Sequence, residues 1–193
     1  MELLLADWVF GYGSLIWNPE VDFDHAELGR LRGFHRQFCI HSTRHRGTPE
    51  DPGVVLGLDR GGSCIGLAYR LRKTSLKASI EHLYEREMHN RVYVPTLVGV
   101  TLDSGERISA LTFVANRNSD AYQRLPEHEV VRRLTGCCGQ RGANFDYLLN
   151  TVRSLEERGV RDSMLTRLRE RMSAAGLWPA GATAAAAESA FAA

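Results

Sequence analysis

Hydrophobic and polar residues alternate in short runs through the first two thirds of the chain, which is the pattern of β-strands. Glycine or proline stands at the borders of several runs, as expected where strands give way to turns. The predicted strands are residues 8–12, 34–41, 54–59, 64–71, 92–102 and 107–115. The last two flank Asp103-Ser-Gly-Glu106, and a tight turn between two apolar runs predicts a hairpin.

A helical period interrupts the strands once and replaces them after residue 115. The first predicted helix covers residues 74–88, with Thr74 or Ser75 placed to cap it. Three later helices are predicted, one from Pro126 to about Cys137, one over about 144–158, and one from about Asp162 to before Gly176. The last two carry apolar stripes formed by Leu148, Val152 and Leu155, and by Leu165, Leu168 and Met172.

Strands that dominate the first part and helices that gather toward the C-terminus indicate an α+β fold rather than a doubly wound βαβ sheet. A closed or nearly closed mixed β-barrel fits this order, although the pattern alone leaves closure open. A chain of 193 residues is most economically one domain. We expect that domain over residues 1–176. Residues 177–193 form an alanine-rich tail with little to bury, so from Pro179 onward we expect disorder or weak helix.

The charge balance favours a small-molecule partner. Lysine plus arginine (24) nearly equal aspartate plus glutamate (23), so no strong field attracts nucleic acid or an anionic membrane surface. No apolar run reaches the roughly 18 residues of a membrane span. Residues 1–6 lack the basic start and long apolar centre of a secretory signal, which predicts a cytoplasmic protein.

Cysteines and histidines show no spacing typical of a metal site. The four cysteines at 39, 64, 137 and 138 form no C-x-x-C pair, and the seven histidines form no H-E-x-x-H motif. Cys137 and Cys138 could be redox-active, but two small residues at a helix end are the more ordinary interpretation. We therefore expect no metal and no cofactor.

Glu87 is the strongest candidate for chemistry. At about 100° per residue, Glu87 falls within about 20° of Leu76 on the helical wheel, on the stripe that also holds Ile80 and Leu83. Glu85 falls on the opposite, solvent side. Burial disfavours the charged form of a carboxylate and makes it a better proton acceptor, which suits a general base. The alternative is a structural role, in an internal salt bridge or a loop cap.

A glycine-rich turn, Gly11-Tyr-Gly-Ser14, follows the first strand. Bare main-chain N–H groups at such a turn can cradle a carboxylate or an oxyanion, although most Gly-x-Gly turns are structural. The turn lacks the third glycine of a dinucleotide-binding fingerprint and the Gly-Lys-Ser/Thr of a phosphate loop. It also lacks the Gly-x-Ser-x-Gly of a serine hydrolase. An anion nest and an inward base are the minimum that an intramolecular acyl transfer requires of an enzyme.

Two further regions carry polar candidates. The segment 42–49 is rich in donors, and it is either a solvated turn or a rim where Arg44 and Arg46 bind substrate carboxylates. Tyr147 lies at the edge of its helix's apolar stripe, where its phenol could point into a pocket. A core tyrosine with a satisfied hydroxyl is the more common case.

Several blocks resemble, in order and approximate spacing, those of the ChaC-type γ-glutamylcyclotransferases. The resemblance extends from about Trp8 to Arg171, and its blocks are Val9-Phe-Gly-Tyr-Gly-Ser-Leu15, His45-Arg-Gly-Thr48 with Pro52-Gly53, Gly66-Leu-Ala-Tyr-Arg70, Arg86-Glu-Met88 and Asn144-Phe-Asp-Tyr-Leu148. Arg44 departs from the pattern, since many relatives carry Asp there. The segment 137–142 also departs, because it replaces a turn rich in Gly and Ser.

The resemblance implies a γ-glutamylcyclotransferase-like barrel with helices packed outside it, and cleavage of glutathione to 5-oxoproline and cysteinylglycine without a cofactor. It implies Glu87 as the catalytic acid/base. The implied substrate-binding residues are Val9, Phe10, Gly11, Tyr12, Gly13, Ser14, Leu15 and Tyr147. Two alternatives remain, the same fold acting on other γ-glutamyl amino acids or amines, and a non-catalytic module that binds γ-glutamyl metabolites or a protein. The oligomeric state is not predicted.

Overall fold

The computed structural model describes residues 4–88 and 91–179. The chain divides into two compact units. The first takes in Met1–His41 and Val55–Leu125, and the second takes in Ser42–Val54 and Pro126–Ala193. The expectation of a single domain over residues 1–176 stays a prediction. The predicted alanine-rich tail falls almost entirely on residues 180–193, which lie outside the described residues.

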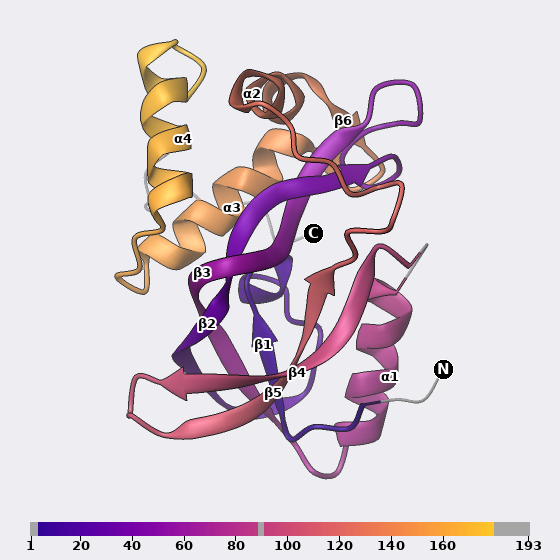
Figure 1. The fold of residues 1–193 in the computed structure, drawn as a ribbon, viewed down its shortest axis with the longest axis vertical. Helices are drawn as coiled ribbons and strands as arrows, with labels where there is room; N and C mark the ends of the chain where they lie inside the picture. Colours follow the sequence, from indigo (N-terminus) through magenta and orange to yellow (C-terminus); the bar gives the residue numbers. More distant parts are fainter. Residues whose placement is uncertain (1–3, 89–90, 180–193) are drawn as a thin grey trace, which may run out of the picture. The chain divides into compact units, whose positions relative to one another are not determined.

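Five strands, which belong to the first unit except for Ser42 at the end of one and Gly53 and Val54 at the start of another, close into a barrel in the order β1-β3-β2-β4-β5 (Figure 1). They are β1 (Trp8–Gly11), β2 (Phe23–Ser42), β3 (Gly53–Leu71), β4 (Tyr93–Leu102) and β5 (Arg107–Ala115). The pairs β1–β3, β2–β4 and β4–β5 are antiparallel, whereas β1 and β3 each pair with β5 in parallel. The sheet is therefore mixed and closed, which confirms the predicted α+β class. The hairpin between β4 and β5 turns at Gly105, whose φ is +91°.

Two strands are longer than the sequence pattern predicts. β2 begins at Phe23 rather than near residue 34, and β3 continues through residues 60–63, where a break between two strands is predicted. Glycines with positive φ explain both errors: Gly33 lies within β2, and Gly61 and Gly62 lie within β3. Glycine adopts this conformation without the penalty that other residues carry, so a strand can bend there and continue.

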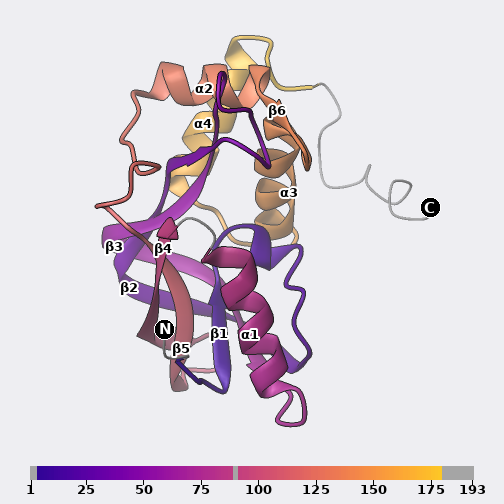
Figure 2. The ribbon, with the colours of Figure 1, turned by 90° about the vertical axis from the view of Figure 1, so that its right-hand side faces the viewer.

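Helix α1 (Leu76–Glu87) packs against the barrel beside β1 (Figure 2). Ile80 and Leu83 are fully buried in a core cluster with Val9 and Phe113, and Glu85 is exposed. The predicted apolar stripe is thus confirmed. Ser75 precedes the helix as predicted, but its hydroxyl donates to Asp22 at 2.7 Å instead of capping the first turn.

The second unit is helical apart from a short hairpin. Its elements are α2 (Glu127–Gly136), β6 (Cys138–Gly139), β7 (Gly142–Ala143), α3 (Asn144–Glu156) and α4 (Ser163–Ala174). The three predicted helices are confirmed, and all six side chains of their predicted stripes are buried. Asp162 caps α4 by accepting from the N–H groups of Met164 and Leu165.

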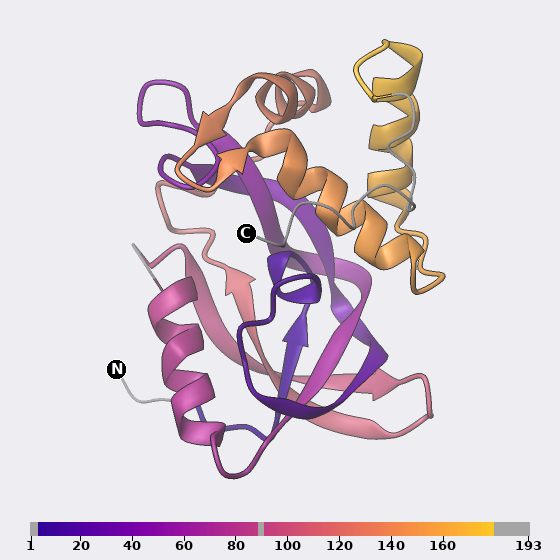
Figure 3. The same ribbon diagram turned by 180° about the vertical axis from the view of Figure 1, so that it is seen from behind.

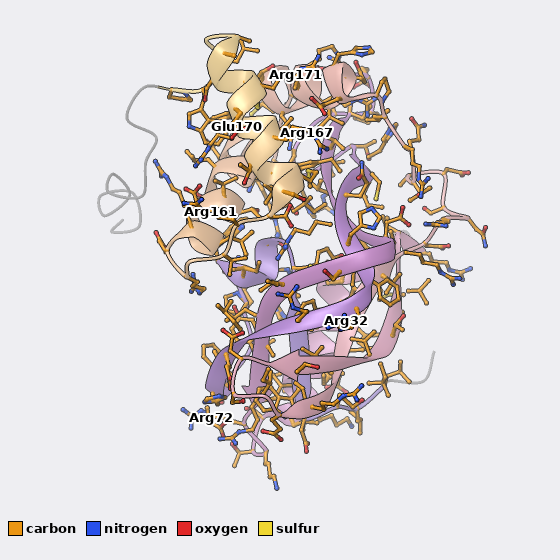
Figure 4. The ribbon with its side chains drawn as sticks, turned by 60° about the vertical axis from the view of Figure 1, so that its left-hand side comes forward. Arg32, Arg72, Arg161, Arg167, Glu170 and Arg171 are labelled. Carbon is orange, nitrogen blue, oxygen red and sulfur yellow. The ribbon has the colours of Figure 1, made fainter. Side chains whose placement is uncertain are left out.

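Helices α2 and α4 are joined by an ion-pair cluster on their surfaces. Arg167 and Arg171 lie one turn apart on α4 (Figure 4). Their guanidinium groups lie 3.4 Å and 2.8 Å from the two carboxylate oxygens of Glu127. Both arginines are more than half exposed, so this cluster orients the helices and adds little to stability.

Candidate active site in the first unit

The glycine-rich loop leaves β1 at Gly11 and enters a 3-10 turn, η1 (Ser14–Ile16), at the end of the barrel strand (Figure 3). A Cβ on Gly11 would lie 2.9 Å from Cβ of Leu15, and a Cβ on Gly66 would lie 2.3 Å from the Gly11 carbonyl oxygen. Both contacts are closer than real side chains allow. Glycine is therefore required at both positions for the loop to fold back on β3.

The loop is mostly buried. Val9, Phe10, Tyr12 and Leu15 are buried in the core, so Val9 and Phe10 expose almost no surface. Ser14 is half-buried, and it is the point at which residues 9–15 reach the surface.

Three carbonyls of this loop are engaged by other parts of the barrel, and those of Gly13 and Ser14 accept from N–H groups that follow directly in the chain. The Phe10 oxygen accepts from the Thr112 hydroxyl at 2.9 Å, and the Tyr12 oxygen accepts from Nε of Arg36 at 2.5 Å. The Leu15 oxygen accepts from the Tyr69 hydroxyl at 2.7 Å.

The main-chain N–H groups of the loop differ from its carbonyls. Among the described residues, no acceptor is found for the main-chain N–H groups of Gly13, Ser14 and Leu15. Unengaged N–H groups on a turn whose carbonyls are held elsewhere form a surface that suits an anion. Gly13 has φ −128°, so a left-handed backbone is not the reason for glycine at this position, and close approach of a ligand stays a prediction.

Glu87 ends helix α1 with its side chain 15% exposed, so it faces inward as predicted. Its Oε1 lies 3.1 Å from Nε of Arg86, whose own side chain is 7% exposed. The same guanidinium donates from Nη2 to the Ser14 hydroxyl at 2.9 Å. One arginine therefore connects the candidate base to the glycine-rich loop.

Arg86 is held from a further side by the segment that follows η1. Its Nη1 donates to the Asn18 carbonyl at 2.7 Å and to Oε2 of Glu20 at 3.0 Å. Glu20 also accepts from the Asn18 side chain, and its φ of +51° is uncommon for a residue other than glycine. The guanidinium thus lies between two carboxylates, those of Glu20 and Glu87, in a half-enclosed setting. The sequence identified Arg86 only as part of a block, although its place next to Glu87 was the available signal.

Tyr147 belongs to the second unit, on α3, and is buried there. Its ring lies under the guanidinium of Arg46, with Cζ 5.8 Å from the ring centroid, and Nη1 of Arg46 donates to the Ala143 carbonyl at 2.9 Å. The neighbouring Asn144 fixes the start of β3, since its amide both accepts from the Val54 N–H and donates to the Val54 carbonyl.

The structure separates the two arginines considered for a carboxylate-binding rim. Arg46 is buried, and burial lowers the pKa of its guanidinium, whereas Arg44 is exposed and donates to Gln140 at 2.9 Å. Cys137 follows α2 and is buried beside Asp51, and Cys138 is exposed, so the pair lies at a helix end as the ordinary interpretation predicts.

Within residues 4–88 and 91–179, no group of three or more His, Cys, Asp or Glu side chains is arranged to hold a metal ion. Over the same residues, no helix combines the length and apolarity needed to cross a membrane.

Comparison with known proteins gives a consistent result. The family model described as ChaC-like protein matches residues 7–175. A glutathione-specific gamma-glutamylcyclotransferase of Escherichia coli (strain K12) is 36% identical over 162 residues, which cover 83% of this chain and 70% of that protein. Gamma-glutamylcyclotransferase 2-3 of Arabidopsis thaliana is 31% identical over 173 residues, which cover 85% of this chain and 87% of that protein.

The fold is shared with a solved structure. A yeast γ-glutamyl cyclotransferase specific to glutathione aligns with a TM-score of 0.80 at 23% identity, over 89% of this chain and 97% of that one. This likeness confirms the predicted type of barrel.

Proposed function

The chain belongs to the ChaC-like family, and from that premise we propose that it cleaves glutathione into 5-oxoproline and cysteinylglycine. The names of its bacterial and yeast relatives support this substrate, and the name of the plant relative supports the γ-glutamylcyclotransferase reaction. Glutathione keeps the thiols of the cytosol reduced, so a cytoplasmic location fits the activity. The four free cysteines are compatible with such a compartment.

The reaction needs no nucleophile from the enzyme. The α-amine of the γ-glutamyl group attacks its own γ-carbonyl carbon, a C–N bond closes the five-membered lactam, and the bond to the cysteine nitrogen breaks. No water is consumed, and the protons that leave the attacking nitrogen end on the departing amine. The enzyme must therefore hold the substrate in a bent conformation, stabilise the tetrahedral oxyanion and carry protons between the two nitrogens.

Glu87 is proposed as the proton carrier. The observation that carries this assignment is the contact of Arg86 with both the Glu87 carboxylate and the Ser14 hydroxyl, because it connects an inward acid to a loop of available amides. The 15% exposure of the Glu87 side chain leaves it accessible to a small ligand while most of its surface is packed. A purely structural acid gives no reason for the amides of Gly13, Ser14 and Leu15 to lack acceptors among the described residues.

Residues 9–15 are proposed to bind the γ-glutamyl end of the substrate. Their N–H groups would hold the α-carboxylate or the developing oxyanion, at roughly 2.7–4 kcal/mol for each oxyanion donor. Tyr147 is a proposed substrate contact on the family resemblance alone.

The test is incubation of the purified protein with glutathione, followed by mass detection of 5-oxoproline and cysteinylglycine. Glu87→Gln keeps the shape of the side chain but cannot accept a proton, and we expect turnover to fall by about 100-fold to 10,000-fold. Glu85→Gln is the matched control, since Glu85 lies on the exposed side of the same helical turn. Equal activity of the two variants would contradict the role of Glu87.

A substrate panel distinguishes the alternatives. If γ-glutamyl amino acids or γ-glutamylamines are cyclised faster than glutathione, the reaction class stands and the substrate assignment is wrong. If none of them is cyclised but they still bind, the protein is a binding module.

A further inference from the structure

Arg36 is a buried cation beneath the glycine-rich loop, and the proposed chemistry does not use it. It lies on β2 and is 2% exposed. Its Nε donates to the Tyr12 carbonyl at 2.5 Å, and its Nη2 donates to the Ile65 carbonyl on β3. Burial of a guanidinium is costly unless its donors are engaged, so a residue of this kind in a barrel interior requires an explanation.

The bond to Tyr12 determines where the next amide points. The Tyr12 carbonyl and the Gly13 N–H belong to one planar trans peptide unit, so the two groups point in opposite directions. While Arg36 holds the carbonyl toward the barrel interior, the Gly13 N–H is directed away from it. That N–H is one of the three loop amides for which the described chain offers no acceptor.

The loop needs this restraint because Tyr12 stands between two glycines. Glycine accepts both signs of φ, so the peptide unit joining Tyr12 to Gly13 can rotate more readily than one between two substituted residues. The Tyr12 side chain is fixed separately, through a 2.8 Å bond from its hydroxyl to the Phe113 carbonyl. That bond anchors the ring, whereas the bond from Arg36 holds the peptide that follows.

We propose that Arg36 is a positioning residue for the γ-glutamyl site: it locks the Tyr12–Gly13 peptide so that the Gly13 N–H is directed at the substrate's anionic group. The inference rests on the proposed function for the identity of that group. A lysine would keep the charge, but it lacks the planar fork that serves the carbonyls of Tyr12 and Ile65 at the same time.

The experiment uses N-glutaryl-cysteinylglycine, a glutathione analogue without the α-amine, which can bind but cannot cyclise. Arg36→Lys is compared with wild type and with Arg133→Lys, a matched change at another buried arginine, one that donates to Glu129 on its own helix. Calorimetry gives the affinity for the analogue. Amide exchange measured by NMR reports whether the Gly13 N–H becomes protected when the analogue saturates the protein.

We expect Arg36→Lys to bind the analogue about 10-fold to 100-fold more weakly, which is the scale of one hydrogen bond to a charged group, and to lose the protection of Gly13 at saturation. Arg133→Lys should lower the melting temperature but leave the affinity for the analogue and the protection of Gly13 unchanged. An Arg36→Lys protein that folds, binds with wild-type affinity and protects Gly13 would overturn the proposal.

A second measurement needs no variant. In wild-type protein labelled with ¹⁵N-arginine, the Nε–H resonance of Arg36 should shift when the analogue is added, because its acceptor peptide is polarised by the ligand. A resonance that does not move under saturating analogue would also overturn the proposal. If wild type binds the analogue through Gly13 but does not cleave glutathione, the proposed activity fails and the role of Arg36 stands.

Discussion

Ser14 accepts a 2.9 Å hydrogen bond from Nη2 of Arg86, a residue that lies 72 positions later in the chain. The bond joins the one half-exposed residue of the glycine-rich loop to the last turn of α1, directly before Glu87. The glycine-rich loop and the candidate base Glu87 therefore both contact the guanidinium of Arg86. The distance between the loop and Glu87 is set by this one planar group and not only by the packing of the two elements. A site whose first contacts are held in this way keeps its geometry when substrate enters.

Arg86→Lys should therefore lower kcat for glutathione by about 10-fold to 100-fold, with a smaller change in KM. An ammonium group can contact only part of the set formed by Ser14, Asn18, Glu20 and Glu87, and losing one hydrogen bond to a charged partner has this scale. Steady-state kinetics measure both constants. Arg70→Lys is the control, because Arg70 is half-exposed and pairs with Asp24 at the surface. Equal kcat in Arg86→Lys and wild type would show that the bridge has no part in turnover.

Gly13→Val should weaken binding of N-glutaryl-cysteinylglycine by about 100-fold, which corresponds to roughly 3 kcal/mol of steric exclusion. The backbone of Gly13 has negative φ, so the penalty is expected from the space that the ligand needs. Calorimetric titration measures the affinity, and thermal unfolding establishes that the variant is folded. Gly99→Val is the control, since nothing lies within 4 Å of a Cβ built there. Unchanged affinity in a folded Gly13→Val protein would contradict the prediction that the ligand approaches Gly13 closely.

Features that depend on local periodicity were predicted from the sequence, whereas contacts between residues far apart in the chain were not. The 3.6-residue period placed Glu87 inside and Glu85 outside, because both positions depend only on their own helix. Arg36 was missed, although strand alternation puts it on one face with Phe38 and Ile40, which are buried. What identifies its role is the Tyr12 carbonyl, 24 residues earlier in the chain, and no local pattern specifies that partner.

Dependence on long-range contacts also explains why the bounds of β2 and β3 were predicted wrongly. Glycines such as Gly61 and Gly62 end a strand in most sequences, and only the barrel's closure determines that β3 passes through them. Arg86 shows the opposite case: its block was visible in the sequence next to Glu87, but its other three acceptors lie within residues 14–20, which only the fold brings to it.

Asp59→Asn should destabilise the barrel by about 2 kcal/mol at neutral pH. The carboxylate is 1% exposed, and although burial raises its pKa, bonds from Arg117, Arg124, the Arg60 N–H and the Tyr122 hydroxyl lower it from the ordinary 3.8 to about 2. A lowered carboxyl pKa stabilises the folded state above pH 3.8, and this contribution is lost as the pH falls through about 2. Denaturant unfolding at several pH values measures the difference.

The pH dependence separates this ion pair from a general packing defect. The gap between wild type and Asp59→Asn should be constant from pH 7 to about pH 5 and should narrow below pH 4. Asp24→Asn provides the control, because Asp24 pairs with Arg70 at the exposed surface and its loss should change stability little. A gap that persists unchanged at pH 2 would assign the effect of Asp59 to shape instead of charge.

Turnover should survive exhaustive chelation, because in the proposed reaction the attacking amine and the carbonyl both belong to the substrate and Glu87 is the proposed proton carrier. Activity is measured before and after dialysis against EDTA, with 5-oxoproline detected by mass. Loss of activity with recovery on adding back a divalent metal would move the assignment toward metal-assisted hydrolysis.

Turnover should also survive replacement of all four cysteines. Burial raises the pKa of Cys39 to about 12 and also raises that of Cys137, so neither provides a thiolate at neutral pH. Cys39, Cys64 and Cys137 are buried and are best changed to alanine, whereas the exposed Cys138 can be changed to serine. Each single variant is checked for thermal unfolding first, since a core cavity can lower stability without affecting the chemistry.

Thiol reagents are applied to the enzyme before glutathione is added, because the substrate is itself a thiol. A γ-glutamyl thioester on any of these cysteines, seen by intact mass, would replace the intramolecular mechanism with thiol acyl transfer.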